Sequence, residues 1–287
     1  MDRQPERSPS TAWAQPLIPA LLGVRVDGST PAMVRPMVVG RTVVVTGASR
    51  GIGRCVAERL AQVGATVLAV ARDETALQSL PGGAVPCVLD LRDTDAATAT
   101  AEHLLAEHGA PGLVISNAGH SIHRYLAEYT DRFHDVARLS GVNFLGPIAF
   151  LLPLLREMTA TCSGHLINVS TTSIDVPLPG WSAYTSTKAG FDVWLASVAP
   201  ELRAAGVRTT SLHLPRVRTA MSAPTAGRYP VPELTIDQAA DVVCRAIVHR
   251  PRIVRPWWAA AGGTLTGLAP GVADTVFAGI LSSGRRV

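Results

Sequence analysis

The sequence predicts an α/β protein built on a doubly wound parallel sheet, and two features of the chain predict it. From residue 41 onward, short runs rich in Val, Ile and Leu alternate with longer stretches of helical length. The short runs are also continuously apolar, as strands are when helices cover both faces of a parallel sheet. Right-handed crossovers between such strands give a single doubly wound domain, which we expect to span residues 37–250.

The expected elements follow one another along this domain. The first strand, at 42–46, is Val-rich and ends at a glycine turn that opens the first helix, near 51–63. Each later strand is a similar short apolar run, and a helical stretch fills each interval before the next strand. The later strands are expected at 66–70, 84–89, 113–116, 165–169 and 207–213. The later helices are expected near 73–80, 95–108, 126–158, 181–204 and 236–249.

Two extensions flank the domain. Residues 1–36 contain six prolines and no sustained period, so we expect an N-terminal extension that is flexible at first, although its stretch 16–26 is apolar enough to pack on a surface. Residues 251–287 form an apolar C-terminal tail, rich in Ala and Gly, with Asp274 the only charge between Trp257 and Leu281. Its glycines and Pro270 make it a poor transmembrane helix. A lid over a pocket, an oligomer contact and a membrane-surface segment are the three interpretations of this tail.

The composition argues against several function classes. Of the 287 residues 17% are charged, the net charge is +4, and no long basic run occurs, so we expect no nucleic-acid binding. Four cysteines are scattered without a CxxC pair, so we expect neither a metal site nor a disulfide framework. Reduced thiols and the absence of a secretory pattern near Met1 favour a cytoplasmic protein.

A glycine turn between the first strand and the first helix predicts a dinucleotide site of the Rossmann type. Without side chains, the backbone can approach a pyrophosphate, and the first N–H groups of the helix can donate to its oxygens. The residues expected to line this turn are Gly47, Ser49, Arg50, Gly51, Ile52 and Gly53.

The end of the second strand favours NADP(H) over NAD(H). An acidic residue at position 71 would accept hydrogen bonds from the ribose diol of NAD, which Ala71 cannot do. Arg72 offers a planar fork for a 2′-phosphate, and Arg50 lies nearby in the glycine turn. The alternative is that Arg72 is a solvated surface residue.

Tyr184 and Lys188 form the candidate acid–base pair. They are four residues apart, so on a helix they share one face. An ammonium beside a phenol favours the phenolate, so we expect a lowered pKa for Tyr184 and a role in proton transfer.

These motifs, with others in a fixed order, resemble the short-chain dehydrogenase/reductase family of the classical type over residues 40–250. The other matching motifs are Asp90-Leu91, Asn117-Ala118-Gly119, Asn143 and the strand at 167–171. The stretches 117–146 and 214–225 are similar to the branch of actinobacterial and related fatty acyl-CoA reductases.

The resemblance implies a catalytic set of four residues. Tyr184 would protonate the oxyanion that hydride transfer leaves on a carbonyl, and Lys188 would lower the phenol pKa and bind the nicotinamide ribose. Asn143 would order a water that links Lys188 to solvent. Thr171 stands where the family usually has a serine that orients the substrate oxygen. Ser170 is the fallback, because neighbours on a strand face opposite ways and only one can point at the substrate.

The resemblance also implies further cofactor contacts. Asp90 would bind the adenine, Leu91 would add a backbone contact, and Asn117, Ala118 and Gly119 would lie beneath the cofactor. The segment after the last strand would reach the nicotinamide and the phosphates through Pro215, Val217 and Thr219. Arg216 replaces the usual glycine after the proline, so Arg216 or Arg218 could meet an anionic part of the substrate.

We therefore expect an NADP(H)-dependent oxidoreductase that reduces a carbonyl of a hydrophobic substrate, which is a ketone, an aldehyde or an acyl thioester. The alternatives are a ketoreductase that tailors a secondary metabolite and, in another class, an NADPH-binding regulatory or scaffold protein without turnover. The resemblance further implies a homodimer or homotetramer. Peripheral membrane contact would involve the C-terminal tail.

Overall fold

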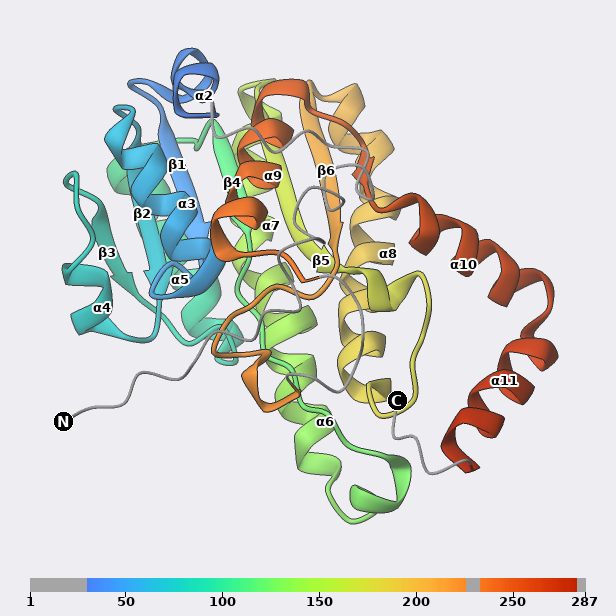
Figure 1. The fold of residues 1–287 in the computed structure, drawn as a ribbon. Coiled ribbons are helices and arrows are strands. Elements are labelled where there is room, and N and C mark those ends of the chain that lie inside the picture. Colours follow the sequence, from blue (N-terminus) through green and yellow to red (C-terminus); the bar gives the residue numbers. More distant parts are fainter. Residues whose placement is uncertain (1–29, 226–232, 283–287) are drawn as a thin grey trace, which may run out of the picture.

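Seven parallel strands form one sheet in the order β3-β2-β1-β4-β5-β6-β7 (Figure 1). The computed structural model describes residues 30–225 and 233–282. The strands are β1 (Thr42–Thr46), β2 (Thr66–Ala71), β3 (Val85–Val88), β4 (Leu113–Ser116), β5 (Gly164–Thr171), β6 (Val207–Leu214) and β7 (Ile253–Val254). The predicted doubly wound Rossmann sheet is thereby confirmed, and β7 adds a strand that the sequence did not predict, because two residues are too few to show a pattern.

Helices cover both faces of the sheet. The longer ones are α2 (Thr30–Val38), α3 (Gly51–Gln62), α5 (Thr94–His108), α6 (Phe133–Ser140), α7 (Gly146–Ala160), α8 (Ser182–Ala204), α9 (Ile236–His249), α10 (Trp257–Leu268) and α11 (Pro270–Ser282). The short ones are α4 (Glu74–Gln78), the 3-10 turns η2 (Leu126–Glu128), η4 (Thr172–Ile174) and η5 (Ala223–Thr225), and the π-helical turn η3 (Gly141–Leu145).

Two hydrophobic cores lie on opposite faces of the sheet. On β1, Val43 and Val45 belong to the core shared with α2, α3 and α9, whereas Val44 belongs to the core shared with α5, α7 and α8. This alternation is the consequence of successive side chains pointing to opposite faces of a strand. It explains why the interior positions of β1, β2 and β4 are apolar.

The strand order reverses beside β1, whose neighbours are β2 on one side and β4 on the other. The crossovers leave this point in opposite directions, so a crevice opens beyond the carboxyl ends of β1 and β4. Open α/β sheets bind their ligands in such a crevice. The loops that carry the predicted motifs all follow the carboxyl ends of strands, so they gather at this edge of the sheet.

Helix α2 begins inside the segment that the sequence placed before the domain. Its Val34 and Val38 are each 1% exposed and pack in the core beside α3 and α9. Pro36 within the helix removes one backbone donor and concealed the helical pattern. The expectations for residues 1–29, including the apolar stretch 16–26, fall outside the described residues.

The prediction of a single helix near 126–158 is wrong at the start of that range. Residues 126–132 form successive tight turns, in which the N–H groups of Tyr129 and Arg132 donate to carbonyls three residues earlier, at 3.2 and 3.0 Å. A continuous helical run then covers Phe133–Ala160 through the π-helical turn. In the described part of the chain this run is long and apolar enough to cross a membrane, but half of it is buried inside the protein.

Candidate active site

The turn between β1 and α3 requires glycine at three positions. Gly47 and Gly51 have φ angles of 70° and 60°, in the left-handed region that disfavours side chains. A Cβ on Gly53 would lie 2.3 Å from the carbonyl oxygen of Gly47, and a Cβ on Gly47 would lie 2.9 Å from the Cα of Ala118. The backbone therefore packs more closely here than any side chain would allow.

This turn fits the phosphates of a dinucleotide. The side chain of Arg50 makes no capping hydrogen bond to the first turn of α3, so those N–H groups face the crevice without a side-chain acceptor. Other helices of the sheet are capped by the side chains of Asp73, Asp93 and Thr235. Thr219 lies beside the same turn, with its Cγ2 3.6 Å from the position of a Cβ on Gly51. The glycine turn thus brings together four of the predicted residues, Ser49, Arg50, Ile52 and Thr219.

The loop after β4 is fixed to the end of β1. The Thr46 hydroxyl accepts hydrogen bonds from the N–H groups of Asn117 and Ala118, each at 3.0 Å. The Asn117 side chain donates to the Thr46 carbonyl at 3.0 Å. Asn117 and Ala118 therefore form the floor of the crevice, as the resemblance implied.

An acidic residue and two arginines border the crevice beside β2 and β3. The Asp90 carboxylate accepts side-chain hydrogen bonds from Arg92 at 2.5 and 3.0 Å and lies 3.9 Å from Arg72. The bonds from Arg92 lower the pKa of Asp90 below its usual value. Leu91 is buried, and its carbonyl oxygen would lie 1.7 Å from a Cβ on Gly146, so α7 starts directly against this loop.

Positive charge surrounds His120 at the same edge. Burial lowers the pKa of His120, and four guanidinium groups lower it further because they repel a second cation. These groups belong to Arg138, Arg72, Arg50 and Arg92. Such a concentration of arginines suits a phosphate group.

Tyr184 and Lys188 lie on α8 beside the end of β5. The Lys188 ammonium is 7% exposed and donates to the Val169 carbonyl at 3.0 Å. The Thr171 side chain forms a hydrogen bond with that of Tyr184. The hydroxyl of Ser170 is buried and has no partner among the described residues. Thr171, rather than Ser170, therefore belongs to the same site as Tyr184.

Asn143 lies in the π-helical turn and fixes the loop after β4. Its Oδ1 accepts from the His120 N–H at 2.9 Å, and its Nδ2 donates to the His120 carbonyl and to the Thr187 hydroxyl, both at 3.0 Å. A Cβ on Gly119 would lie 3.1 Å from Asn143 Oδ1 and 3.3 Å from Lys188 Nζ. The missing side chain of Gly119 thus lets its backbone approach Asn143 and Lys188 closely.

Burial controls the protonation of the pair. It raises the pKa of Tyr184 to about 12, and the hydrogen bond with Thr171 offsets only part of this. Burial also lowers the pKa of Lys188 to about 8, against the attraction of Asp192, which raises it. The expectation of a lowered phenol pKa is wrong for this structure, because desolvation of the phenolate outweighs the hydrogen bond with Thr171.

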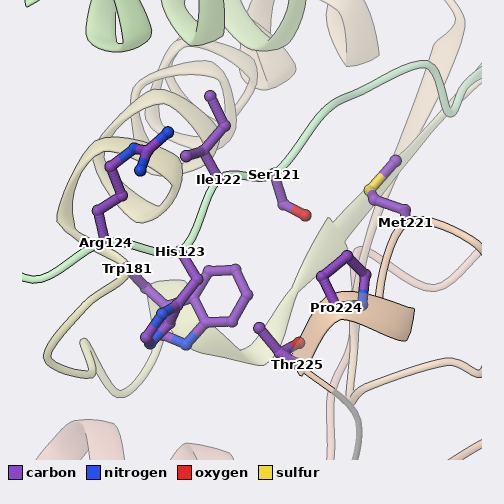
Figure 2. Close-up of a pocket in the computed structure, with 8 residues that line it drawn as sticks. All are labelled: Ser121, Ile122, His123, Arg124, Trp181, Met221, Pro224 and Thr225. Atoms are coloured by element: carbon purple, nitrogen blue, oxygen red, sulfur yellow. The ribbon is translucent and has the colours of Figure 1, made fainter. Parts of the chain in front are cut away.

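A cleft of about 290 Å³ lies next to this set (Figure 2). Its wall includes Trp181, whose ring centroid lies 5.7 Å from that of Tyr184 and 4.9 Å from that of His123. Figure 2 shows Met221 and Pro224 across the space from the rings of His123 and Trp181. The lining residues are Ser121, Ile122, His123, Arg124, Trp181, Met221, Pro224 and Thr225.

A buried network of charged side chains lies behind Lys188, and only the spacing of Lys188 and Asp192 could have indicated it from the sequence. His213 lies between two carboxylates, with Nδ1 2.8 Å from Asp175 and Nε2 3.2 Å from Asp192. Asp175 also pairs with Arg255 at 2.8 Å. Despite the desolvation that opposes it, hydrogen bonding to Asp175 and Asp192 raises the pKa of His213 to about 9. The imidazole is therefore a cation at neutral pH.

The segment after β6 folds over the crevice. Pro215 directly follows the strand, and Val217 is buried and forms an isolated bridge to Leu234. This pairing closes a loop, part of which lies outside the described residues, and its Met221 contributes to the cleft.

The Arg216 side chain makes its contacts within this loop and not on the outer surface of the protein. It donates to the carbonyls of Thr225 and Ser222 at 2.6 and 2.8 Å and pairs with Glu233 at 2.9 Å. Its guanidinium therefore holds the loop together, which leaves it poorly suited to the anionic substrate group that we had considered.

Comparison with known proteins gives consistent matches. A family model described as short chain dehydrogenase matches residues 41–229. A fatty acyl-CoA reductase from Acinetobacter baylyi is 36% identical over 230 residues, which cover 77% of each chain. A fatty acyl-CoA reductase from Mycobacterium tuberculosis is 34% identical over 265 residues, covering 89% of this chain and 88% of its own. A solved metagenomic short-chain oxidoreductase in complex with NADP is 30% identical, with a TM-score of 0.64, over 74% of this chain and 92% of that one.

Proposed function

Because the chain belongs to the short chain dehydrogenase family and to its fatty acyl-CoA reductase-like branch, we propose that it reduces a carbonyl of a hydrophobic substrate with NADP(H) and that Tyr184 donates the proton. The observation that carries this proposal is the hydrogen bond between Thr171 and Tyr184 beside a glycine-lined crevice. Lys188 lies one helical turn further on, with its ammonium close to the backbone of Gly119.

Each of these residues has a task in the proposed reaction. When bound, the nicotinamide would supply the hydride. Thr171 would hydrogen-bond to the substrate oxygen and orient it, and Tyr184 would transfer its phenolic proton to that oxygen. Lys188 would bind the ribose hydroxyls and favour charge on the phenol oxygen, and Asn143 would hold the loop at His120 and a water beside Lys188.

The protonation of Tyr184 supports reduction as the direction of reaction. A pKa of about 12 keeps the phenol protonated at neutral pH, which is the form that can donate a proton. Oxidation would need the phenolate, which burial disfavours.

The arginines near the second and third strands support NADP(H). Arg72 is 62% exposed at its side chain, so it can turn toward a ligand, and Arg50 and Arg92 lie in the same positive region. Asp90 is neutralised by Arg92, so it would repel a 2′-phosphate less than a free carboxylate would. The NADP bound to a solved relative is consistent with this preference.

Replacing Arg72 tests the cofactor preference. We expect Arg72→Ala to raise the Kd for NADPH by about tenfold to a hundredfold, because a charge-assisted contact to the 2′-phosphate is lost. The Kd for NADH, which lacks that phosphate, should hardly change. Fluorescence titration of both cofactors measures the two constants, and Arg203→Ala, an exposed arginine at the far end of α8, is the matched control. Equal weakening for both cofactors would reject the contact.

The substrate class follows from the cleft and from the relatives. Ile122, Trp181, Met221 and Pro224 give the cleft an apolar part, which suits an aliphatic chain, beside the polar side chains of the rest of its lining. Two relatives are named fatty acyl-CoA reductases. A long-chain aldehyde or acyl thioester is therefore the first candidate, and a ketone of a secondary metabolite is the second.

A turnover assay distinguishes these candidates from a protein that only binds the cofactor. We expect loss of NADPH absorbance with long-chain aldehydes or acyl thioesters, and kcat/KM that rises with chain length as apolar surface is buried. A preference for cyclic ketones would favour the ketoreductase. Tight NADPH binding without turnover on ketones, aldehydes or thioesters would favour the regulatory or scaffold protein, for which the replacement of serine by Thr171 is the supporting observation.

We also propose that the protein is a cytoplasmic homodimer or homotetramer, and that its folded domain extends beyond the expected bounds of 37–250 to include α2 and β7. Leu145, Leu152 and Val193 support an oligomer, because these apolar side chains are each more than half exposed on η3, α7 and α8. Light scattering of the purified protein measures the assembly.

A further inference from the structure

The two C-terminal helices form an arm, residues 257–282, that extends beyond the sheet and its covering helices (Figure 1). The base of the arm is fixed, because Ala259 is buried and because Cβ atoms on Gly262 and Gly263 would lie only 2.7 and 2.8 Å from Val176 and Asp175. Beyond this base the arm is uncovered. No described residue of α11 is buried.

Large apolar side chains are exposed along the whole arm. Leu265 and Leu268 on α10 are 68% and 81% exposed, and Val272 and Val276 on α11 are 64% and 53% exposed. On each helix the large apolar side chains lie on one side, with Trp257, Leu265 and Leu268 on α10 and Val272, Val276 and Ile280 on α11. The opposite side of α10 packs on the protein at the base of the arm through Ala259, Gly262 and Gly263, so the apolar side faces away from the protein. A helix with one apolar side can lie in a membrane surface with that side among the acyl chains.

The hydroxyl groups of the arm are satisfied within their own helices. Each one donates to a backbone carbonyl three or four residues earlier, so none depends on water for its hydrogen bond. The pairs are Thr264 with Ala260 at 3.0 Å, Thr266 with Gly263 at 3.1 Å, Thr275 with Gly271 at 2.8 Å and Ser282 with Gly279 at 3.0 Å. This is how Ser and Thr are accommodated in lipid-embedded helices.

Charge is concentrated at the ends of the arm. Arg252 precedes it and is exposed, whereas Arg255 is paired with Asp175. The sequence places Arg285 and Arg286 just after the arm, outside the described residues. Trp257, at the junction with the basic segment, is 65% exposed. Arginines bind lipid phosphates, and tryptophan prefers the boundary between headgroups and acyl chains.

The dimensions of the arm favour the membrane surface over a span. Helices of 12 and 13 residues are roughly 18 and 20 Å long, which is shorter than a hydrocarbon core of about 30 Å. The two helices meet at an angle of 109°, so they do not join into one straight span. In a surface position, the single charge of Asp274 can stay at the level of the headgroups.

We propose that the arm embeds in the surface of a membrane that carries anionic phospholipids, with its apolar side chains among the upper acyl chains and Arg252 at its base on phosphate groups. This occupant accounts for the one-sided apolar exposure, the satisfied hydroxyls and the tryptophan and arginine at the base together. A second copy of the chain would account for the exposed side chains alone.

Vesicle flotation of the full chain tests the proposal. We expect the protein to float with phosphatidylcholine vesicles that contain phosphatidylglycerol, and to float less without phosphatidylglycerol or in high salt, because the arginine contacts are screened. Leu268→Glu with Val272→Glu should reduce the bound fraction about tenfold or more, since charged residues are strongly disfavoured in acyl chains. Leu126→Glu with Val88→Glu, also exposed apolar positions but outside the arm, should float as the wild type does.

Three outcomes would overturn the proposal. The first is a wild-type protein that stays in solution with both kinds of vesicle. The second is an arm variant that has an unchanged circular dichroism spectrum and floats as well as the wild type. The third is an arm variant that changes the oligomeric state in light scattering while neither protein floats, which would assign the arm to a contact between copies. If the bound fraction depended neither on phosphatidylglycerol nor on salt, the proposed arginine contacts would be rejected.

Discussion

Tyr184→Phe should lose most of the turnover while it keeps its affinity for NADPH. The substitution removes only the phenolic oxygen, which is the proposed proton donor and the partner of Thr171. General acid catalysis contributes about 10²–10⁴-fold to such reactions, so kcat should fall by about that factor. Stopped-flow measurement of NADPH oxidation gives kcat, and fluorescence titration gives the Kd.

Tyr129→Phe is the matched control for this experiment. Its hydroxyl is hydrogen-bonded to Ser182, near the start of the same helix, but it lies outside the proposed catalytic set. The control should retain turnover. If Tyr184→Phe also turned over at the wild-type rate, Tyr184 would not be the proton donor, and another group would have to supply the proton.

His213→Gln should lower the free energy of unfolding by about 3 kcal/mol near pH 6. The imidazolium is 5% exposed and neutralises two buried carboxylates, Asp175 and Asp192. A pKa raised from 6.5 to about 9 corresponds to a stabilisation of about 3 kcal/mol, and removing one partner of a buried ion pair has effects of this size. Urea unfolding followed by circular dichroism measures the difference.

The pH dependence of this difference identifies the charge on His213. Because its pKa is raised in the folded state, its contribution is complete below the unfolded value of about 6.5 and disappears as the pH rises through about 9. Other groups titrate in both proteins, so the difference between wild type and His213→Gln should shrink over that interval. A constant difference would mean a neutral imidazole in the folded protein. The control is His103→Gln, at a histidine on α5 that is 66% exposed. It should change the free energy of unfolding little at pH 6 and at pH 9.

Most of the sheet could be predicted because its information is local. The Val-rich run of β1 and the glycine turn after it are contiguous in sequence, and β1, which is buried on both faces, is apolar at each interior position. The sites that follow the strands could therefore be placed at one edge before any coordinates were known. Helix α2 was not predicted because Pro36 conceals its helical pattern. Strand β7 was not predicted because two residues are too few to show a pattern.

The network around His213 could not be predicted because its partners are distant in sequence. Asp175 and Asp192 lie 38 and 21 positions from His213 and meet it only through the pairing of β5 with β6 and the packing of α8. The same holds for the protonation of Tyr184. The sequence shows the neighbouring lysine, but the desolvation that raises the phenol pKa depends on tertiary packing.

Lys188 is the only lysine in the chain, and its amine is almost inaccessible beside Val169. All other basic side chains are guanidinium or imidazole groups, which amine-directed reagents modify poorly. A reagent of that kind therefore has two targets at most, the amino terminus and the centre of the site. A ¹⁵N label at lysine Nζ would in the same way yield a single side-chain resonance, so that occupancy of the crevice could be followed by one signal without any knowledge of the substrate.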